Sequence, residues 1–404
     1  MKNKSLKHWF VLATCCGLAA SSIGISINSS GVFYSPVCES LNILRGNFSM
    51  HMTIFSLATA LGALFVPYVM KKVPYKILLS VSVLIAVFST AVMGLSTHLI
   101  QFYFLGAIRG LSTSMFSIVP LTMIINQWFE AKHGFATSLV FGFSGLAGSI
   151  CSPIFSYFIE TFGWQSGYFI KAILILCLCL PAVLYPFHMD PKEDELLPYG
   201  YQEKNKEILV DSKKQHFIFI TFFSFIIFSL MCSCITSLTQ HFPGYAVSIG
   251  YSTSIGAMLL SAGMVGNIVS KLIIGVLSDR FGAFRATLFM LVINVFGVFL
   301  LMLAPVSVIL ILGAFLFGSS YSIGAVALPL LTRYFFGDEQ YVKRFPMISF
   351  ASNVGAAISL SMVGYIYDIF GSYTYAFFFA LFMLLICFIM LIYTNQKIFH
   401  KRDK

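Results

Sequence analysis

Long runs of apolar residues, separated by short polar stretches, fill almost the whole chain. Each run is about twenty residues long, the length that an α-helix needs to cross a hydrocarbon layer of roughly 30 Å. Segment 77–93 is apolar at nearly every position, whereas the strands of a membrane barrel alternate apolar and polar side chains. The pattern therefore predicts an all-α membrane protein.

Twelve spans are predicted, six on each side of one long polar stretch. The first six are 9–34, 50–70, 75–95, 98–128, 134–158 and 168–187. The last six are 217–242, 253–276, 286–303, 306–336, 345–367 and 373–393. The stretch 189–216 is rich in Lys, Glu and Asp, so we interpret it as a linker between an N-terminal six-helix bundle at 1–188 and a C-terminal six-helix bundle at 217–404. The first apolar run continues past a typical signal-peptide cleavage position, and we expect that span to stay uncleaved.

Composition and charge add an orientation to this picture. Hydrophobic residues make up 58% of the chain and charged residues only 10%, which is too apolar for a water-soluble domain. The formal net charge is +10, but the basic residues lie between apolar runs and form no extended basic domain, which argues against nucleic-acid binding. If the termini, the linker and alternate loops lie on one side, that side holds all 25 Lys and Arg except Arg45, Arg109, Lys171 and Lys271. The positive-inside rule predicts that this side, with both termini, is cytoplasmic.

The two halves of the chain are similar to each other. Segment 162–169 has a counterpart at 370–377, and the basic turn 71–74 has one at 279–282 at the same offset. Both turns follow the second predicted span of their half. This duplication predicts two pseudo-symmetric bundles, an arrangement that suits alternating access to a site near the middle of the membrane. The expected cavity is lined by spans one, four, seven, eight, ten and eleven.

One of these turns carries a sequence motif. Gly275, Leu277, Asp279, Arg280 and Gly282 follow the order Gly-x-Leu-x-Asp-Arg-x-Gly, which resembles the signature of the major facilitator superfamily. The first glycine permits close helix packing, the last permits a tight turn, and the aspartate can accept hydrogen bonds from a neighbouring helix end. We interpret the motif as a conformational element away from the substrate. A solvated turn that obeys charge topology is the alternative.

A second resemblance covers the end of the fourth span and the fifth span. Trp128, Phe129, Lys132, Gly134 and Ala136 are similar to the Trp-Phe-x-x-Lys-Arg-Gly-x-Ala pattern of the oxalate-formate antiporter and monocarboxylate transporter families. Three glycines then follow at a spacing of three, which leaves part of a helix face open to close packing: Gly142, Gly145 and Gly148. The resemblance implies a secondary transporter of a small organic anion in the cell membrane.

The same resemblance indicates substrate-binding residues. Lys271 occupies the eighth-span position that is usually an arginine binding the substrate carboxylate, and Asn267 lies one helical turn earlier. Asn28 aligns with the first-helix lysine of the monocarboxylate family, and Asn353 is the polar residue nearest to the eleventh-span lysine of the antiporter family. The monocarboxylate family has an acidic residue in the eighth helix that is linked to proton coupling, and Asn267 aligns with it. The resemblance therefore excludes proton symport through an acid at this position.

Charge provides an argument that does not depend on the resemblance. No Asp or Glu lies in the central part of a predicted span, while a cation there costs several kcal/mol, roughly 2.5–3.5 on insertion scales. A carboxylate substrate would supply the missing negative charge. We therefore assign Lys271 and Arg109 to substrate binding, Arg109 on predicted burial alone. The alternatives are that Lys271 extends to the headgroups or pairs with Asp279, that Arg109 bonds helix-end carbonyls, and that Lys171 reaches the outer interface near Glu160.

The sequence thus predicts a transporter that moves a mono- or dicarboxylate by alternating access. An exporter of hydrophobic compounds and a transporter-like sensor without transport are the alternatives. No sequence motif of a membrane-embedded enzyme occurs, and neither a cofactor nor a metal is expected. The expected partners are the anion, a coupling ion or counter-anion, and membrane lipids, with the protein acting as a monomer.

Overall fold

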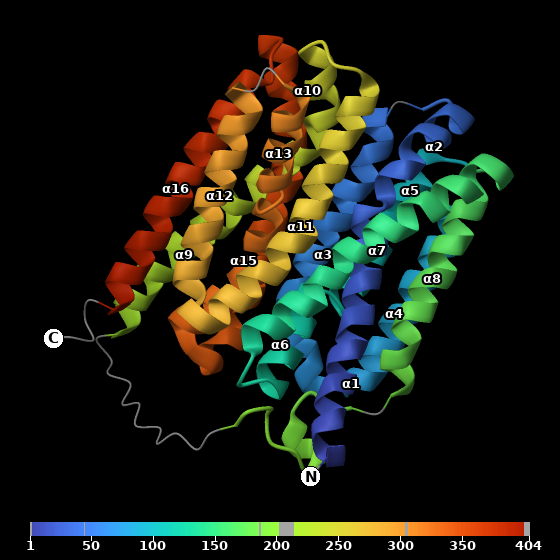
Figure 1. Ribbon diagram of the computed structural model, residues 1–404. Coiled ribbons are helices and arrows are strands. Elements are labelled where there is room, and N and C mark those ends of the chain that lie inside the picture. The colour runs from blue at the N-terminus through green and yellow to red at the C-terminus, as the bar shows by residue number, and fades with distance from the viewer. Residues whose placement is uncertain (1, 44, 186, 202–213, 304–305, 400–404) are drawn as a thin grey trace. The chain divides into compact units, whose positions relative to one another are not determined.

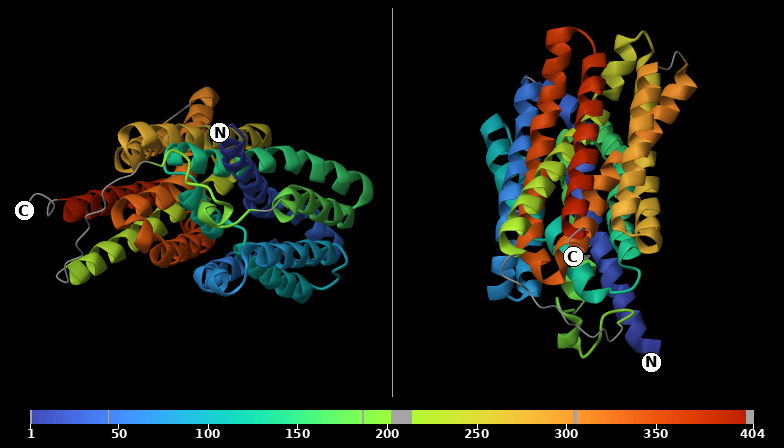
Figure 2. Two further views of the ribbon diagram at one scale, coloured as in Figure 1. Left: turned by 90° about the horizontal axis from the view of Figure 1, so that it is seen from below. Right: turned by 90° about the vertical axis from the view of Figure 1, so that its left-hand side faces the viewer.

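The computed structural model describes residues 2–43, 45–185, 187–201, 214–303 and 306–399. The chain forms two compact units, Met1–Tyr199 and Gly200–Lys404. Nearly all described residues are helical, and within each unit the long helices run side by side (Figures 1 and 2). The all-α prediction is therefore confirmed.

The first unit contains the following helices, where η marks π- and 3-10 segments: α1 Lys2–Ala19, η1 Ala20–Asn28, η2 Ser30–Phe33, α2 Tyr34–Leu41, α3 Arg45–Lys72, α4 Tyr75–Met93, α5 Leu99–Ser114, α6 Ile118–Trp128, α7 His133–Phe162, α8 Trp164–Leu184 and η3 Pro191–Asp194. Helix α3 packs along α5, α4 packs along α8, and the π-helical segment η1 packs along α7.

The second unit contains these helices: α9 Lys214–Thr236, η4 Ser237–His241, α10 Phe242–Ser248, α11 Thr253–Phe281, α12 Ala283–Leu303, α13 Ser307–Phe317, α14 Ser320–Ser322, η5 Ile323–Ala327, α15 Leu328–Phe370 and α16 Thr374–Phe399. Helix α9 packs along α15 and α16, and α11 packs along α13.

Among the described residues, 11 helical stretches are long and apolar enough to cross a bilayer. One of them, Ser307–Ser359, has 53 residues and would be roughly 80 Å long as a single helix, far more than one crossing requires. Gly337 divides it, because its φ of 75° and ψ of 171° interrupt the helical backbone inside α15. The stretch therefore holds two spans, and the prediction of twelve is confirmed.

Four of the twelve spans are not continuous α-helices, a feature that the sequence analysis did not predict. Span one continues as the π-helix η1, span four is interrupted between α5 and α6, span seven changes into η4, and span ten contains η5. Three of these irregular segments are followed by a proline in the first turn of the next helix: Pro120 in α6, Pro243 in α10 and Pro329 in α15. A proline is tolerated there because first-turn N–H groups need no partner within the helix.

Residues 187–199, which include the first part of the predicted linker, pack against the start of α1 at one end of the first unit (Figure 1). Lys7 Nζ lies 2.8 Å from Asp194 Oδ1, and His188 Nδ1 lies 2.9 Å from the same oxygen. Trp128 Nε1 donates to the His188 carbonyl at 3.1 Å. Residues 202–213 of the predicted linker lie outside the described residues. Residues 187–199 thus contact span one through Lys7 and span four through Trp128.

Asp194 is the charged centre of this contact. Its burial favours the protonated form, but hydrogen bonds from Lys7 and His188 outweigh burial, so the pKa of Asp194 lies below its usual value. A carboxyl group whose pKa is lower in the folded protein stabilises the fold above its unfolded pKa of about 3.9, and this stabilisation disappears as the pH falls through the folded value.

We predict that Asp194→Asn lowers the thermal unfolding midpoint at pH 7, because the folded state loses the ion pair with Lys7 and a hydrogen bond with His188. The difference from wild type should shrink as the pH falls from 5 towards 3, measured by unfolding in detergent solution. Glu193→Gln is the matched control, since that side chain is exposed on the same turn. A difference that stays constant across this pH range would contradict the assignment.

Candidate functional site

The second unit buries a lysine and an asparagine on one face of α11. Lys271 is 2% exposed and Asn267 is 1% exposed, and the two lie one helical turn apart. The Asn267 Oδ1 atom has no hydrogen-bond partner within the described part of the chain. The face therefore presents a buried ammonium group next to a carboxamide, a combination that suits recognition of a small polar or anionic group.

Close contact between backbones holds this part of α11 in place. A Cβ atom built on Gly318 would lie 2.7 Å from the Asn267 backbone nitrogen and would also collide with the carbonyl oxygen of Gly263. Ser270 Oγ donates to the Asn267 carbonyl at 3.1 Å and to the Gly318 carbonyl at 3.4 Å. Because no side chain separates the end of α13 from α11, the position of Asn267 is fixed by the helix pair and not by a flexible loop.

The first unit buries two further cations. Arg109 on α5 is 1% exposed, and its Nη2 atom donates to the Ser26 carbonyl in η1 at 3.2 Å. The guanidinium carbon lies 4.6 Å from the centre of the Phe55 ring. Lys171 on α8 is 1% exposed and donates to Ser30 Oγ at 2.9 Å. Arg109 is thus buried, as the sequence predicted. Its bond to the Ser26 carbonyl also agrees with the alternative that Arg109 has a structural role, bonding backbone carbonyls.

The expectation that Lys171 extends outward near Glu160 is wrong. Helix α8 begins at Trp164, so Lys171 lies roughly 10 Å further along the helix axis. It lies in the buried stripe of α8, which also contains Gly167 and Tyr168, whereas Glu160 is exposed. The helical spacing of four between Gly167 and Lys171 was the sequence signal that could have placed this lysine inside the bundle.

His51 on α3 was also missed, and it belongs to the same group of basic side chains. It is 2% exposed and interacts electrostatically with both Arg109 and Lys171. Its Nδ1 atom bonds the Phe48 carbonyl, and since a carbonyl oxygen only accepts, that nitrogen carries the hydrogen. Arg109, Lys171 and His51 thus lie near one another in the interior of the first unit.

The two other predicted substrate ligands bond to backbone. Asn28, at the end of η1, donates through Nδ2 to the Ser144 carbonyl at 3.2 Å. Asn353 donates through Nδ2 to the Ser349 carbonyl, one turn earlier in α15, at 2.8 Å. Both side chains are half-buried. Of the predicted ligands, Asn267 and Lys271 lie on one face of α11. Asn28 lies in η1, the segment whose Ser26 carbonyl accepts a hydrogen bond from Arg109.

The signature motif forms the end of α11. Gly282 has a φ of 87°, a left-handed conformation that favours glycine, and the turn is closed by its N–H donating to the Ser278 carbonyl at 3.0 Å. Asp279 and Arg280 are exposed, while Gly275 is buried. The tight turn expected of Gly282 is therefore observed. Gly275 lies one helical turn from Lys271, and Asp279 lies two turns from it.

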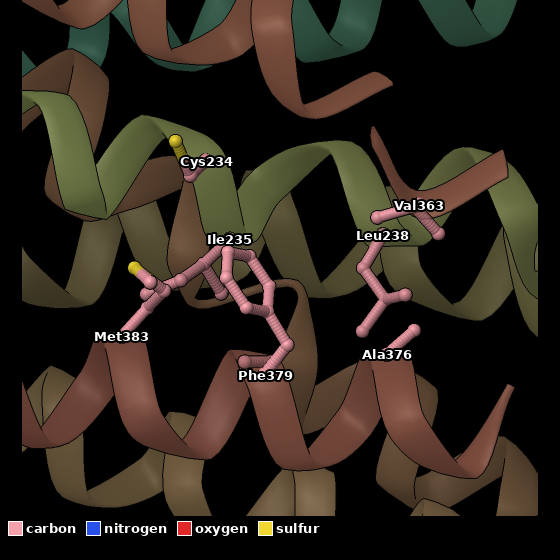
Figure 3. A pocket seen from close by; sticks show the side chains of 8 residues that line it. Cys234, Ile235, Leu238, Val363, Ala376, Phe379 and Met383 are labelled. Atoms are coloured by element: carbon pink, nitrogen blue, oxygen red, sulfur yellow. The ribbon is translucent and has the colours of Figure 1, made fainter. Parts of the chain in front are cut away.

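A small pocket also lies in the second unit, between α9, α15 and α16 (Figure 3). Its lining is apolar: Cys234, Ile235, Leu238, Val363, Ala376, Phe379, Ala380 and Met383. None of the predicted ligands lines it, and it offers no charged group that would orient an anion. We do not assign substrate binding to it.

Twelve spans in two units, with an interruption in spans one, four, seven and ten, form the kind of repeated helical bundle that is found in secondary transporters. Residues 14–342 match the Major Facilitator Superfamily, and residues 257–404 match it again. The chain therefore belongs to the Major Facilitator Superfamily. The family resemblance predicted from the sequence motifs is confirmed.

Known proteins similar to the chain agree with this placement. Monocarboxylate transporter 12 of Xenopus laevis is 24% identical over 308 residues, which cover 71% of this chain and 66% of that protein. The Homo sapiens protein of the same name is 24% identical over 300 residues, 68% of this chain and 58% of that protein. The matched region is thus less than two thirds of the length of these relatives. The crystal structure of the transporter FucP in the outward conformation has a TM-score of 0.66 at 13% identity, covering 95% of this chain and 97% of FucP, and supports the fold alone.

We predict that Gly318→Ala destabilises the protein by roughly 1–3 kcal/mol, because the new methyl group collides with backbone atoms of α11. Gly324→Ala is the matched control in the same span, where the nearest atom to a new Cβ is Ser233 Oγ at 3.9 Å. Thermal unfolding in detergent measures both. Equal midpoints for the two variants would contradict the close packing of α11 and α13.

Proposed function

We propose that this protein is a secondary active transporter that moves a small organic anion, a mono- or dicarboxylate, across the cell membrane by alternating access. The observation that carries the proposal is an imbalance of buried charge. Arg109, Lys171 and Lys271 are each at most 2% exposed, whereas no Asp or Glu is buried within the described parts of the twelve spans.

Low-dielectric surroundings make this imbalance costly. A buried charge loses its hydration, and the loss is offset only when an opposite charge or several hydrogen bonds replace the water. A negatively charged substrate would supply that opposite charge at the moment it binds. A neutral or cationic substrate would leave the imbalance unchanged or increase it, so the buried cations favour an anion.

Lys271 and Asn267 are the ligands that we propose for the second unit. Lys271 would bind a carboxylate oxygen through a charge-assisted hydrogen bond, which is about twice as strong as a neutral one. The Asn267 carboxamide lies on the same face and is oriented by the packing of α11 against Gly318. The similarity to monocarboxylate transporter 12, named for monocarboxylates, is in keeping with this assignment.

The remaining parts of the proposal concern topology and coupling. The distribution of Lys and Arg favours cytoplasmic termini and a cytoplasmic linker. Asn267 does not titrate, so proton coupling through that side chain is excluded and exchange of anions is the coupling mode we favour. We propose that the transport unit is a monomer with lipid around its exposed apolar faces.

The direct experiment is counterflow of a labelled carboxylate in proteoliposomes. Lys271→Ala should lower the rate by roughly tenfold or more, since a hydrogen bond to a charged group is worth about 1.5–3 kcal/mol. Lys271→Arg should retain part of the activity because it keeps the charge.

Lys343→Ala is the matched control, because it removes an exposed lysine of the same unit. It should transport at the wild-type rate. Wild-type rates for Lys271→Ala, in protein that unfolds at the wild-type temperature, would remove Lys271 from the site.

A further inference from the structure

Arg109 and Lys171 are joined through one turn of span one. The Ser26 carbonyl accepts a hydrogen bond from Arg109 Nη2 at 3.2 Å and another from Ser30 Oγ at 2.8 Å. Ser30 Oγ in turn accepts from Lys171 Nζ at 2.9 Å. The two cations, carried by α5 and α8, thus meet at the same short segment, which lies at the junction of the π-helix η1 and the 3-10 helix η2.

The contacts of Lys171 do not neutralise its charge. Its hydrogen-bond acceptor is the Ser30 hydroxyl, and its Nζ atom lies 5.1 Å from the centre of the Phe33 ring. Lys171 also interacts electrostatically with Arg109, a like charge in the same interior. Like charges repel, and the repulsion is stronger in a low-dielectric interior than in water. A single negative group near both side chains would offset the charge of each.

The surroundings of the two cations are apolar and polarizable. Arg109 Nη1 lies 3.4 Å from the Met93 sulfur, and Nη2 lies 3.6 Å from the Met52 sulfur. Phe33 and Phe55 add aromatic faces over Lys171 and Arg109. Such walls interact well with an apolar or aromatic body and poorly with a second charged group. They select for a ligand with one charged end.

From this geometry we infer that Arg109, Lys171 and Ser30 form an anion site inside the first unit that takes the carboxylate of a monocarboxylate with an apolar body. The inference rests on the proposed function and narrows its substrate class. It adds Lys171 and Ser30 as ligands, and the dicarboxylate alternative is disfavoured because the apolar walls provide no partner for a second carboxylate.

Span one controls access to this site. Both cations are 1% exposed in the structure, so the anion reaches them when the segment from Ser26 to Ser30 moves. That segment is neither regular α-helix nor loop, and π-helical turns inside a helix are frequent at functional sites. Movement of the segment breaks the Lys171–Ser30 bond and the Ser30–Ser26 bond. The carboxylate then accepts hydrogen bonds from Lys171 Nζ and from the released Ser30 hydroxyl.

Ligand binding to purified protein tests the inference, with sodium benzoate, acetate and succinate as probes at constant ionic strength. Dissociation constants come from thermal stabilisation in detergent. Wild type should bind benzoate more tightly than acetate or succinate. Lys171→Gln should weaken benzoate binding by roughly tenfold or more, and Lys171→Arg should restore most of it.

Ser30→Ala provides a variant that keeps both charges, and it should weaken benzoate binding by roughly fivefold. Ser29→Ala is its matched control. Ser29 is buried on the same segment and donates to the carbonyl four residues earlier at 2.7 Å, as Ser30 does at 2.8 Å, but it does not contact Lys171. Ser29→Ala should bind benzoate as wild type does.

The possible outcomes separate this inference from the proposed function. Unchanged benzoate binding in Ser30→Ala and Lys171→Gln, together with weaker binding in Lys271→Ala, would overturn the site in the first unit and leave the proposed function standing. Tighter binding of succinate than of benzoate would overturn the apolar monocarboxylate. Absence of binding for all three probes would overturn both proposals.

Discussion

Positive charge held in an apolar interior is the constraint on which the structure depends. An ammonium or guanidinium group inside a membrane bundle needs either a carboxylate or enough hydrogen bonds to replace its hydration. The described parts of the spans bury Arg109, Lys171 and Lys271, and they bury no Asp or Glu. The partners seen around the first two are a backbone carbonyl, a serine hydroxyl, thioether sulfurs and aromatic rings. Such partners hold the side chains in place, and in the proposed function a negatively charged ligand balances the net positive charge.

The irregular segments of spans one and ten contact the buried residues of the candidate sites. In span one, the π-helix exposes the Ser26 carbonyl to Arg109, and the turn that follows brings Ser30 to Lys171. In span ten, Gly318 follows α13 directly and lies against the backbone of Asn267. Segments of this kind can change conformation at a lower cost than a regular helix, because fewer backbone hydrogen bonds must break. The segments that contact Arg109, Lys171 and the Asn267 backbone are thus also the ones best suited to move during the proposed transport cycle.

The fold was largely predictable because it depends on properties that the sequence displays directly. The length of each apolar run determined twelve spans, and Lys71 and Arg280 marked turns between them. The interruptions of the spans were not predicted, although Pro120, Pro243 and Pro329 each indicated a helix start that a continuous span could not accommodate. The π-helix of span one has no proline, so the sequence contained no comparable signal.

The site was predicted less completely, since burial depends on which face of a helix meets its neighbours. Lys271 was assigned from a family pattern and is buried as expected. Lys171 was predicted near the outer interface from its distance to the end of the span. The face of the helix on which it lies, which it shares with Gly167, was not taken into account. Its partner Ser30 lies 141 residues away in the chain, and no local pattern connects the two.

A matched pair of ligands, one charged and one neutral, tests the central claim most directly. Benzoate and benzamide have similar shapes and differ in the negative charge, so wild-type protein in detergent should be stabilised against heat by benzoate and not by benzamide. The same result should hold for acetate and acetamide, with smaller shifts. Equal stabilisation by both members of each pair would show that the buried cations do not select for an anion, and would contradict the account.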